Sequence, residues 1–199
     1  MNKRQGIVSL SKQHLMTLIK SISGIRGTIG GNINENLTPI DAVKFAAAYG
    51  SWLQQKHPNT TLSVVLGRDA RISGEMIQNL VQYTLIGLGI NIIDVGLSTT
   101  PTVELMVPQH KANGGIILTA SHNLKQWNAL KLLNEDGEFL NAKEGQDILN
   151  IAESSSFSFA DVDTLGKVAL IKNAIDQHID HVLTLSLVNV DLIRNAKLK

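Results

Sequence analysis

The chain has 199 residues, of which 43% are hydrophobic and 18% charged, which is enough apolar material for one domain of ordinary size. With 18 basic and 17 acidic residues the net charge is +1, so the charge balance favours neither nucleic acid nor a membrane surface as a partner. The absence of cysteine excludes disulfides, thiolate nucleophiles and cysteine-ligated zinc, and it fits a cytoplasmic protein.

The N-terminal residues are predicted to precede the folded domain. Gly6-Ile7-Val8 is far too short for the apolar core of a signal peptide, and no run approaches the ~20 apolar residues of a membrane span. A strand-like run at 18–22 begins just after Met16, which we expect to be the natural start. Residues 1–15 are therefore predicted to be an extension.

Strand and helix patterns alternate from there to residue 119. Thr38 can cap a helix whose first position suits Pro39, and Ser73 can cap a second helix with apolar residues at 3.6-residue spacing. Apolar runs bounded by turn residues predict the strands. The predicted elements are strand 18–22, helix 38–56, strand 62–66, helix 73–88, strand 90–95, a helix from 101 that Pro108 should kink or end, and strand 115–119.

Beyond residue 121 the pattern changes. The runs 130–133 and 138–140 flank Asn134-Glu135-Asp136-Gly137, and Asp-Gly between two apolar runs predicts a hairpin. A short helix at 144–152 is predicted next, followed by a Ser-rich linker at 154–158 and a last helix near 173–187.

Strands separated by helices predict the fold class. They indicate an α/β fold in three layers, α/β/α, around a mostly parallel mixed sheet. In such sheets ligands bind at the carboxyl ends of the strands. The loops at Arg68, Gly96 and Ser121 all leave strand ends, so we expect them to converge on one edge.

The loop at Ser121 holds the residues most suited to chemistry. It lies where a buried strand ends, a place that can expose a hydroxyl on rigid support. His122 could take the serine proton or help to hold a phosphate, and Lys131 could return to the same edge as a proton-shuttling cation. The same residues are also ordinary polar turn chemistry, and no Gly-x-Ser-x-Gly sequence surrounds Ser121 to indicate a hydrolase triad.

Four blocks of sequence occur together in the order of a known family. They are Ser23-Gly24-Ile25-Arg26-Gly27-Thr28, Gly67-Arg68-Asp69-Ala70-Arg71-Ile72-Ser73-Gly74, Gly96-Leu97-Ser98-Thr99-Thr100-Pro101-Thr102 and Thr119-Ala120-Ser121-His122-Asn123. With them, the region from about Lys20 to Lys131 resembles the N-terminal domain of the α-D-phosphohexomutases, which include phosphoglucomutases, phosphomannomutases and phosphoglucosamine mutases. The first block resembles the family's N-terminal active-site loop, and the last block resembles its phosphoserine signature. Leu124 and Ala129 stand where the family usually has proline and glycine.

The resemblance implies an intramolecular phosphotransferase. Such an enzyme moves phosphate between the 1- and 6-positions of a hexose through a phosphoserine and a bisphosphate intermediate. It implies that Ser121 carries the phosphate, an oxygen of which is a ligand of Mg²⁺. Lys131 would be the general acid or base, Arg26 would position the phosphate or tune the pKa of its neighbours, and His122 would orient the phosphate or its metal.

Further residues of these blocks are implied to bind the substrate or its phosphate: Ser23, Gly24, Asn123 and Arg68. Around Arg68-Asp69-Ala70-Arg71 a different interpretation is favoured, in which an arginine pairs with Asp69 and braces the exit from the strand. The implied substrate is a hexose phosphate, and the implied cofactors are Mg²⁺ and a hexose 1,6-bisphosphate activator. No nucleic acid and no membrane is expected as a partner.

The other functional loops of the family are not found in this sequence. These are an Asp-x-Asp-x-Asp-Arg metal loop in domain II, a sugar-selecting loop in domain III and a phosphate-gripping loop in domain IV. The resemblance therefore implies that residues 16–155 form domain I and that 156–199 are a linker and the first helix of an incomplete domain II. Domains II–IV of the same chain would be its partners, and the fragment alone is expected to show negligible mutase turnover.

Two alternatives remain open. One is a module that binds a sugar phosphate or a nucleotide without turnover, although the nucleotide motifs Gly-x-Gly-x-x-Gly and Gly-x-x-x-x-Gly-Lys-Ser/Thr are missing. The other is a naturally truncated paralogue that acts as a scaffold or regulator. The sequence leaves open whether the sugar is glucose, mannose or glucosamine.

Overall fold

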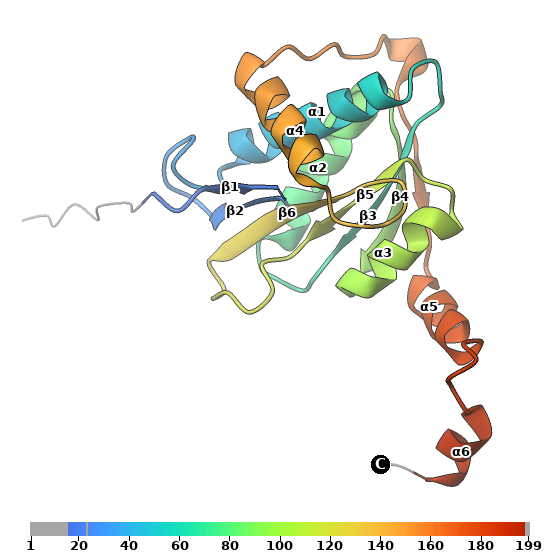
Figure 1. The fold of residues 1–199 in the computed structure, drawn as a ribbon. Helices are drawn as coiled ribbons and strands as arrows, with labels where there is room; N and C mark the ends of the chain where they lie inside the picture. The colour runs from blue at the N-terminus through green and yellow to red at the C-terminus, as the bar shows by residue number, and fades with distance from the viewer. Residues whose placement is uncertain (1–15, 23, 198–199) are drawn as a thin grey trace, which may run out of the picture.

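The computed structural model describes residues 16–22 and 24–197 (Figure 1). The predicted extension at 1–15 and the predicted binding residue Ser23 lie outside the described residues. Among the described helices none is long and apolar enough to cross a membrane.

The described strands form one mixed sheet with the order β1-β2-β6-β5-β3-β4-β7. Strand β3 pairs in parallel with β4 and β5, and β4 pairs in parallel with β7. The pairs β5–β6, β6–β2 and β2–β1 are antiparallel. The strands are β1 Ile19–Ser21, β2 Gly24–Thr28, β3 Ser63–Arg68, β4 Asn91–Leu97, β5 Gly114–Leu118, β6 Trp127–Leu133 and β7 Val168–Leu170.

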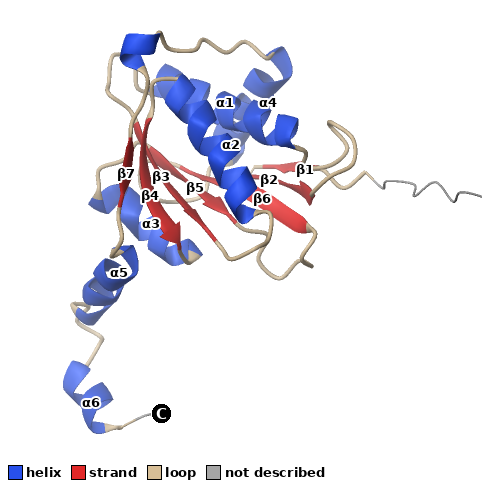
Figure 2. Ribbon diagram, turned by 180° about the vertical axis from the view of Figure 1, so that it is seen from behind, coloured by secondary structure: helices blue, strands red, loops and turns tan. Residues whose placement is uncertain are grey.

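Helices cover both faces of this sheet, which confirms the predicted three layers (Figure 2). On one face lie α1 (Pro39–Lys56), α2 (Gly74–Gly87) and α4 (Ala142–Ser154), and on the other lies α3 (Thr100–Gln109). Strand residues alternate between two separate cores as their side chains alternate in direction. Val64, Leu66, Ile116 and Leu118 pack with α1 and α2, whereas Val65 and Ile117 pack with α3.

The helix starts follow the predicted capping chemistry in part. Thr38 and Asp41 form a capping box at α1, with Pro39 in the first helical position, as expected. Ser73 lies at the start of α2 but makes no capping hydrogen bond with its side chain. Its Oγ instead accepts a hydrogen bond of 3.0 Å from Nδ2 of the buried Asn128 on β6, so it ties α2 to the sheet.

Two local predictions need correction. The stretch from Gly24 to Thr28, expected to be an active-site loop, is the strand β2, which pairs along its whole length with β6. The hairpin expected at 130–140 forms its turn, closed by the bond from the Asn134 amide to the Glu138 carbonyl, but only one isolated antiparallel bridge beyond it, between Leu133 and Phe139.

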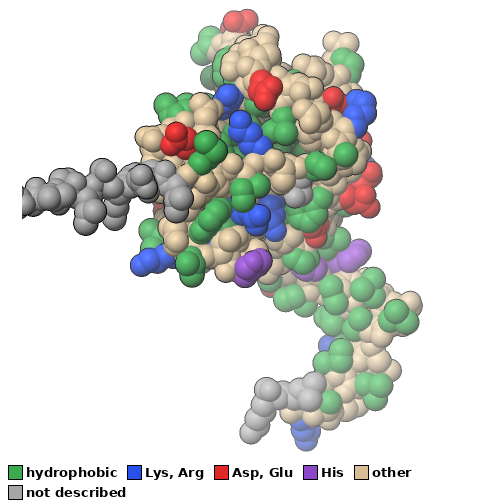
Figure 3. Space-filling model, turned by 60° about the vertical axis from the view of Figure 1, so that its left-hand side comes forward, with side chains coloured by type: hydrophobic (Ala, Val, Ile, Leu, Met, Phe, Trp, Pro, Cys, Tyr) green, Lys and Arg blue, Asp and Glu red, His purple; other side chains and the backbone are tan. Residues whose placement is uncertain are grey.

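The C-terminal segment joins the sheet and then leaves it. After the helical turn Val162–Thr164, β7 pairs with β4, and α5 (Ala174–Leu183) packs against α3. The last helix, α6 (Val190–Asn195), projects away from the body (Figure 1). Figure 3 shows hydrophobic side chains spread over this projecting segment, where Leu187 is 97% exposed. The domain boundary at residue 155 stays a prediction, and β7 beyond it shares the sheet of the residues before it.

Candidate active site

Ser121 lies in the turn that follows β5, at the edge of the sheet where the parallel strands end. Every residue of β5 is buried and Ala120 is buried too, while Ser121 is exposed. Ser121 has φ of 53°, in the left-handed region, which costs a non-glycine residue about 1–3 kcal/mol and persists only where the surroundings hold it. The buried strand therefore gives the hydroxyl a rigid support, and neighbouring groups must hold the Ser121 backbone in its strained conformation.

Thr119 and Asp69 supply part of that support. Thr119 Oγ1 donates a hydrogen bond of 2.6 Å to Asp69 Oδ2 and accepts one of 3.0 Å from the Ser121 amide. The Asp69 amide in turn donates to the Leu118 carbonyl at 3.1 Å. The end of β5 and the exit of β3 are thus joined by both side-chain and backbone bonds.

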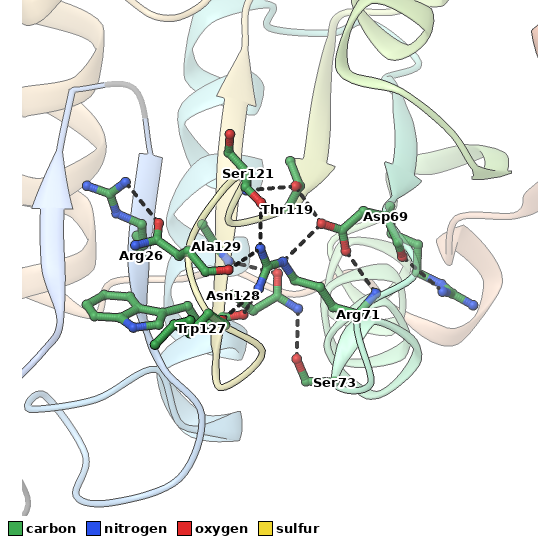
Figure 4. Close-up of polar contacts among 12 residues, drawn as sticks. Arg26, Asp69, Arg71, Ser73, Thr119, Ser121, Trp127, Asn128 and Ala129 are labelled. Atoms are coloured by element: carbon green, nitrogen blue, oxygen red, sulfur yellow. Dashed lines mark hydrogen bonds and ion pairs between the residues drawn. The ribbon is translucent and has the colours of Figure 1, made fainter.

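Arg71 contributes the rest of the support (Figure 4). Its Nε forms an ion pair of 3.0 Å with Asp69 Oδ2, which confirms the predicted Arg–Asp bracing of the strand exit. Its Nη1 and Nη2 donate to four backbone carbonyls of the turn, those of Ser121 (2.7 Å), Asn123 (2.9 Å), Leu124 (2.9 Å) and Trp127 (3.0 Å). Sequence reasoning assigned Arg71 no contact with the serine loop. The feature of the sequence that could have indicated this contact is the second arginine of the strand-exit motif, three residues after Arg68.

The loops at the ends of β3, β4 and β5 converge as expected. Beyond the bonds to the Ser121 turn, the Ser98 amide after β4 donates to the Arg68 carbonyl at 2.9 Å. Arg68 is paired with Leu118 in the β3–β5 register and with Leu97 in the β3–β4 register. Three strand ends therefore form one rim around Ser121, as the topology predicts.

Arg26 reaches this rim from β2. It is half-buried and lies opposite Ala129 of β6, and its Nη1 donates a long bond of 3.4 Å to Asn123 Oδ1 in the Ser121 turn (Figure 4). The structure thus brings together three of the residues that the sequence pointed to: Ser121, Asn123 and Arg26.

Lys131 lies on the same sheet face as Arg26. It pairs with Gly24 of β2 and Ile117 of β5, so it is the diagonal neighbour of Arg26, whose partner Ala129 is two residues away. Its Nζ lies 5.6 Å from the ring centroid of Phe139. In the described part of the chain no hydrogen bond joins the Lys131 side chain to Ser121, and its expected place beside the serine stays a prediction.

Three further predicted residues are placed without a contact to the serine side chain. Arg68 turns to the α2 face, where Nε donates to Gln78 Oε1 at 2.7 Å and Gln78 donates to Asp94 at 2.9 Å. Gly24 is buried against the Leu130 carbonyl. His122 is exposed, and within 16–22 and 24–197 its ring makes no hydrogen bond.

The side chains around Ser121 offer few ligands for a metal ion. Among the described residues there is no group of three or more His, Asp or Glu side chains that could hold an ion. The groups around Ser121 are a threonine hydroxyl, an asparagine amide, arginines and the Asp69 carboxylate, which is already paired with Arg71. These side chains alone do not fit a Mg²⁺ site, which takes carboxylates, phosphates and waters as ligands.

Comparisons with known proteins agree on one family. The family described as "Phosphoglucomutase/phosphomannomutase, alpha/beta/alpha domain I" matches residues 18–159. A phosphoglucomutase/phosphomannomutase of Thermococcus kodakarensis is 33% identical over 162 residues, covering 75% of this chain and 35% of that protein. A protein of Pyrococcus horikoshii named probable phosphoglucosamine mutase is 36% identical over 135 residues, covering 68% of this chain and 28% of that protein.

A solved structure shares the fold. The crystal structure of a phosphoglucomutase/phosphomannomutase family protein from Burkholderia thailandensis superimposes with a TM-score of 0.67 at 20% identity, covering 81% of this chain and 34% of that chain. The chain thus spans about a third of the length of the proteins it matches.

Proposed function

The chain belongs to the phosphoglucomutase/phosphomannomutase family, and we propose that it carries the transferable phosphate of a hexose phosphate mutase on Ser121. The observation that carries the proposal is the exposed Ser121 hydroxyl, which stands on a buried strand in a turn held by Arg71 and Thr119. Family membership supports the reaction class, and this geometry supports the choice of Ser121.

The proposed reaction consists of two phosphoryl transfers, and water takes part in neither. In the first, a hydroxyl oxygen of the hexose phosphate attacks the phosphorus on Ser121, the bond to Oγ breaks, and the sugar hydroxyl loses its proton to a base. In the second, Oγ attacks the other phosphate of the bisphosphate, the bond from that phosphorus to the sugar breaks, and the released sugar oxygen gains a proton. Splitting the isomerisation in this way makes each transfer a direct displacement.

The cationic residues support this assignment electrostatically. Arg26 and Lys131 are diagonal neighbours on one sheet face, and Arg26 already contacts the Ser121 turn through Asn123. We propose that Arg26 positions the phosphate with its guanidinium fork and that Lys131 moves the proton once bound substrate draws it from Phe139. His122, Asn123, Ser23, Gly24 and Arg68 remain proposed secondary contacts.

The remaining parts of the site are proposed to come from outside the described residues. The chain spans about a third of the length of its relatives. We propose that three further domains supply the rest of the site, including the residues that select the hexose. From this chain, Mg²⁺ would receive only an oxygen of the phosphate on Ser121. A cytoplasmic location, and a hexose 1,6-bisphosphate as activator, complete the proposal.

Transfer of labelled phosphate tests the function. We expect the chain, incubated with Mg²⁺ and glucose 1,6-bisphosphate labelled in both phosphates, to retain one equivalent of label after denaturation, whereas Ser121→Ala retains none. Calorimetry with unlabelled glucose 1,6-bisphosphate separates the alternative: binding with no retained label would indicate a sugar-phosphate-binding module and would contradict the proposal.

A further inference from the structure

Arg71 uses every hydrogen-bond donor of its guanidinium on one structural task. An arginine has five N–H groups. Here one goes to the Asp69 carboxylate and four go to the carbonyls of Ser121, Asn123, Leu124 and Trp127, all between 2.7 and 3.0 Å. The side chain is only 11% exposed. None of its donors is left for a phosphate, so Arg71 is not itself an anion ligand in this conformation.

From this arrangement we propose that Arg71 is the positioning residue that holds the Ser121 turn in its phosphate-accepting conformation, an inference that rests on the proposed function. The turn has no regular secondary structure, and its Ser121 is held in the left-handed region. Four converging carbonyls repel one another unless a cation lies between them, and the guanidinium supplies that charge together with a planar geometry.

The bonds to Arg71 also set the direction of the amides in the turn. The described chain has no cis peptide bond, and a trans peptide holds its C=O and N–H in opposite directions. Since the carbonyls of Ser121 and Asn123 point at Arg71, the amides of His122 and Leu124 point away from it. Within the described residues neither amide donates to a protein acceptor. Amides presented in this way suit a phosphate on the outer side of the turn.

Lysine cannot replace arginine in this role. An ammonium keeps the positive charge but has three donors around one nitrogen, so it cannot reach four carbonyls and a carboxylate from one plane. Arg71→Lys therefore separates geometry from charge. Arg194→Lys is the matched control, because Arg194 is exposed on the projecting α6 and contacts no part of the turn.

Hydrogen exchange measured by mass spectrometry tests the inference directly. In Arg71→Lys we expect peptides covering 119–128 to exchange at least about tenfold faster than in the wild type, while peptides covering β3 stay unchanged. The rate of phosphate transfer to Ser121 at saturating glucose 1,6-bisphosphate should fall by a similar factor, with the concentration for half-saturation little changed. Arg71→Ala should show the same two changes. In Arg71→Ala, added guanidinium ion below denaturing concentrations should restore both the exchange rate of the turn and the rate of phosphate transfer, whereas ammonium should restore neither.

The outcomes distinguish the inference from the function beneath it. Wild-type exchange and transfer rates in Arg71→Lys would overturn the inference and leave the proposed function intact. Equal acceleration in β3 and in the turn would also overturn it, because Arg71 would then stabilise the whole fold. A wild-type chain that accepts no phosphate would contradict the proposed function, and the exchange data would still decide whether Arg71 holds the turn.

Discussion

The backbone carbonyl of Ser121 accepts a hydrogen bond of 2.7 Å from the guanidinium of Arg71, a residue 50 positions earlier in the chain. This bond joins the loops after β5 and β3, which are neighbouring parallel strands. Because parallel strands end at the same edge, a residue beyond one strand can shape the loop beyond the next. The serine turn is therefore organised by the strand exit beside it as well as by its own sequence.

Removal of the Thr119 hydroxyl should loosen the turn without leaving a cavity in the core. Thr119→Val keeps the shape but loses the bond to Asp69 and the acceptor for the Ser121 amide. We expect a loss of about 1–2 kcal/mol in the free energy of unfolding, measured by urea titration, because two hydrogen bonds of a buried site are lost. Thr119→Ser keeps the hydroxyl and should retain most of that stability, and equal losses in both variants would contradict the role given to the hydroxyl.

Gly24 should tolerate no side chain, for a reason that is steric. Its φ is +138°, and an added Cβ would lie 2.2 Å from the Leu130 carbonyl oxygen. Gly24→Ala is expected to destabilise the protein by about 2–4 kcal/mol in thermal or urea unfolding, by combining backbone strain with separation of β2 from β6.

Gly30→Ala is the control for that prediction. Gly30 also has a left-handed φ, +92°, but a Cβ there meets nothing within 4 Å. It should therefore show the strain alone, about 1 kcal/mol. If the two variants lose equal stability, the contact with Leu130 is not the cause.

Tyr49 should make stability sensitive to alkaline pH. Its ring is fully buried and its hydroxyl donates to the Leu133 carbonyl at 2.8 Å, and burial raises the pKa of Tyr49 far above its ordinary value of 10.0. The neutral phenol is thus favoured in the folded state. Its contribution is fully present below pH about 10 and declines as the pH rises from there toward the raised pKa, since the unfolded chain ionises first.

Tyr49→Phe checks this reasoning with one variant and two conditions. Near neutral pH it should cost about 1–2 kcal/mol, because the Leu133 carbonyl loses its donor. Above pH 10 the stability of the variant should fall less steeply with pH than that of the wild type in urea unfolding. If the stabilities of the variant and the wild type fall equally steeply above pH 10, Tyr49 is not the cause of the alkaline loss of stability.

The layers and the rim were predictable because they depend on local patterns. Thr38 with Pro39 marks a helix start that the chain uses, and the alternation of strand and helix brings Arg68, Gly96 and Ser121 to one edge. The pairing of an arginine with Asp69 was also accessible, since the residues are neighbours in sequence. Each of these inferences spans only a few residues or follows from topology.

The parts that were missed depend on long-range pairing. β2 contains two glycines and reads as a loop, and it becomes a strand only because β6 lies beside it. The contact of Arg71 with Ser121 needs the β3–β5 register, which no local pattern gives. The place of Lys131 beside the serine stays a prediction: the antiparallel register pairs it with Ile117, and its Nζ lies 5.6 Å from the ring centroid of Phe139.

The most direct test of the central claim is phosphopeptide mapping of the chain after incubation with glucose 1,6-bisphosphate and Mg²⁺, with Ser121→Ala treated in parallel. The account predicts one phosphoryl group on the peptide that contains Ser121, at Ser121 itself, and an unmodified peptide in the variant. Phosphate on any other residue, or equal phosphate in Ser121→Ala, would contradict the assignment of Ser121 as the phosphate carrier.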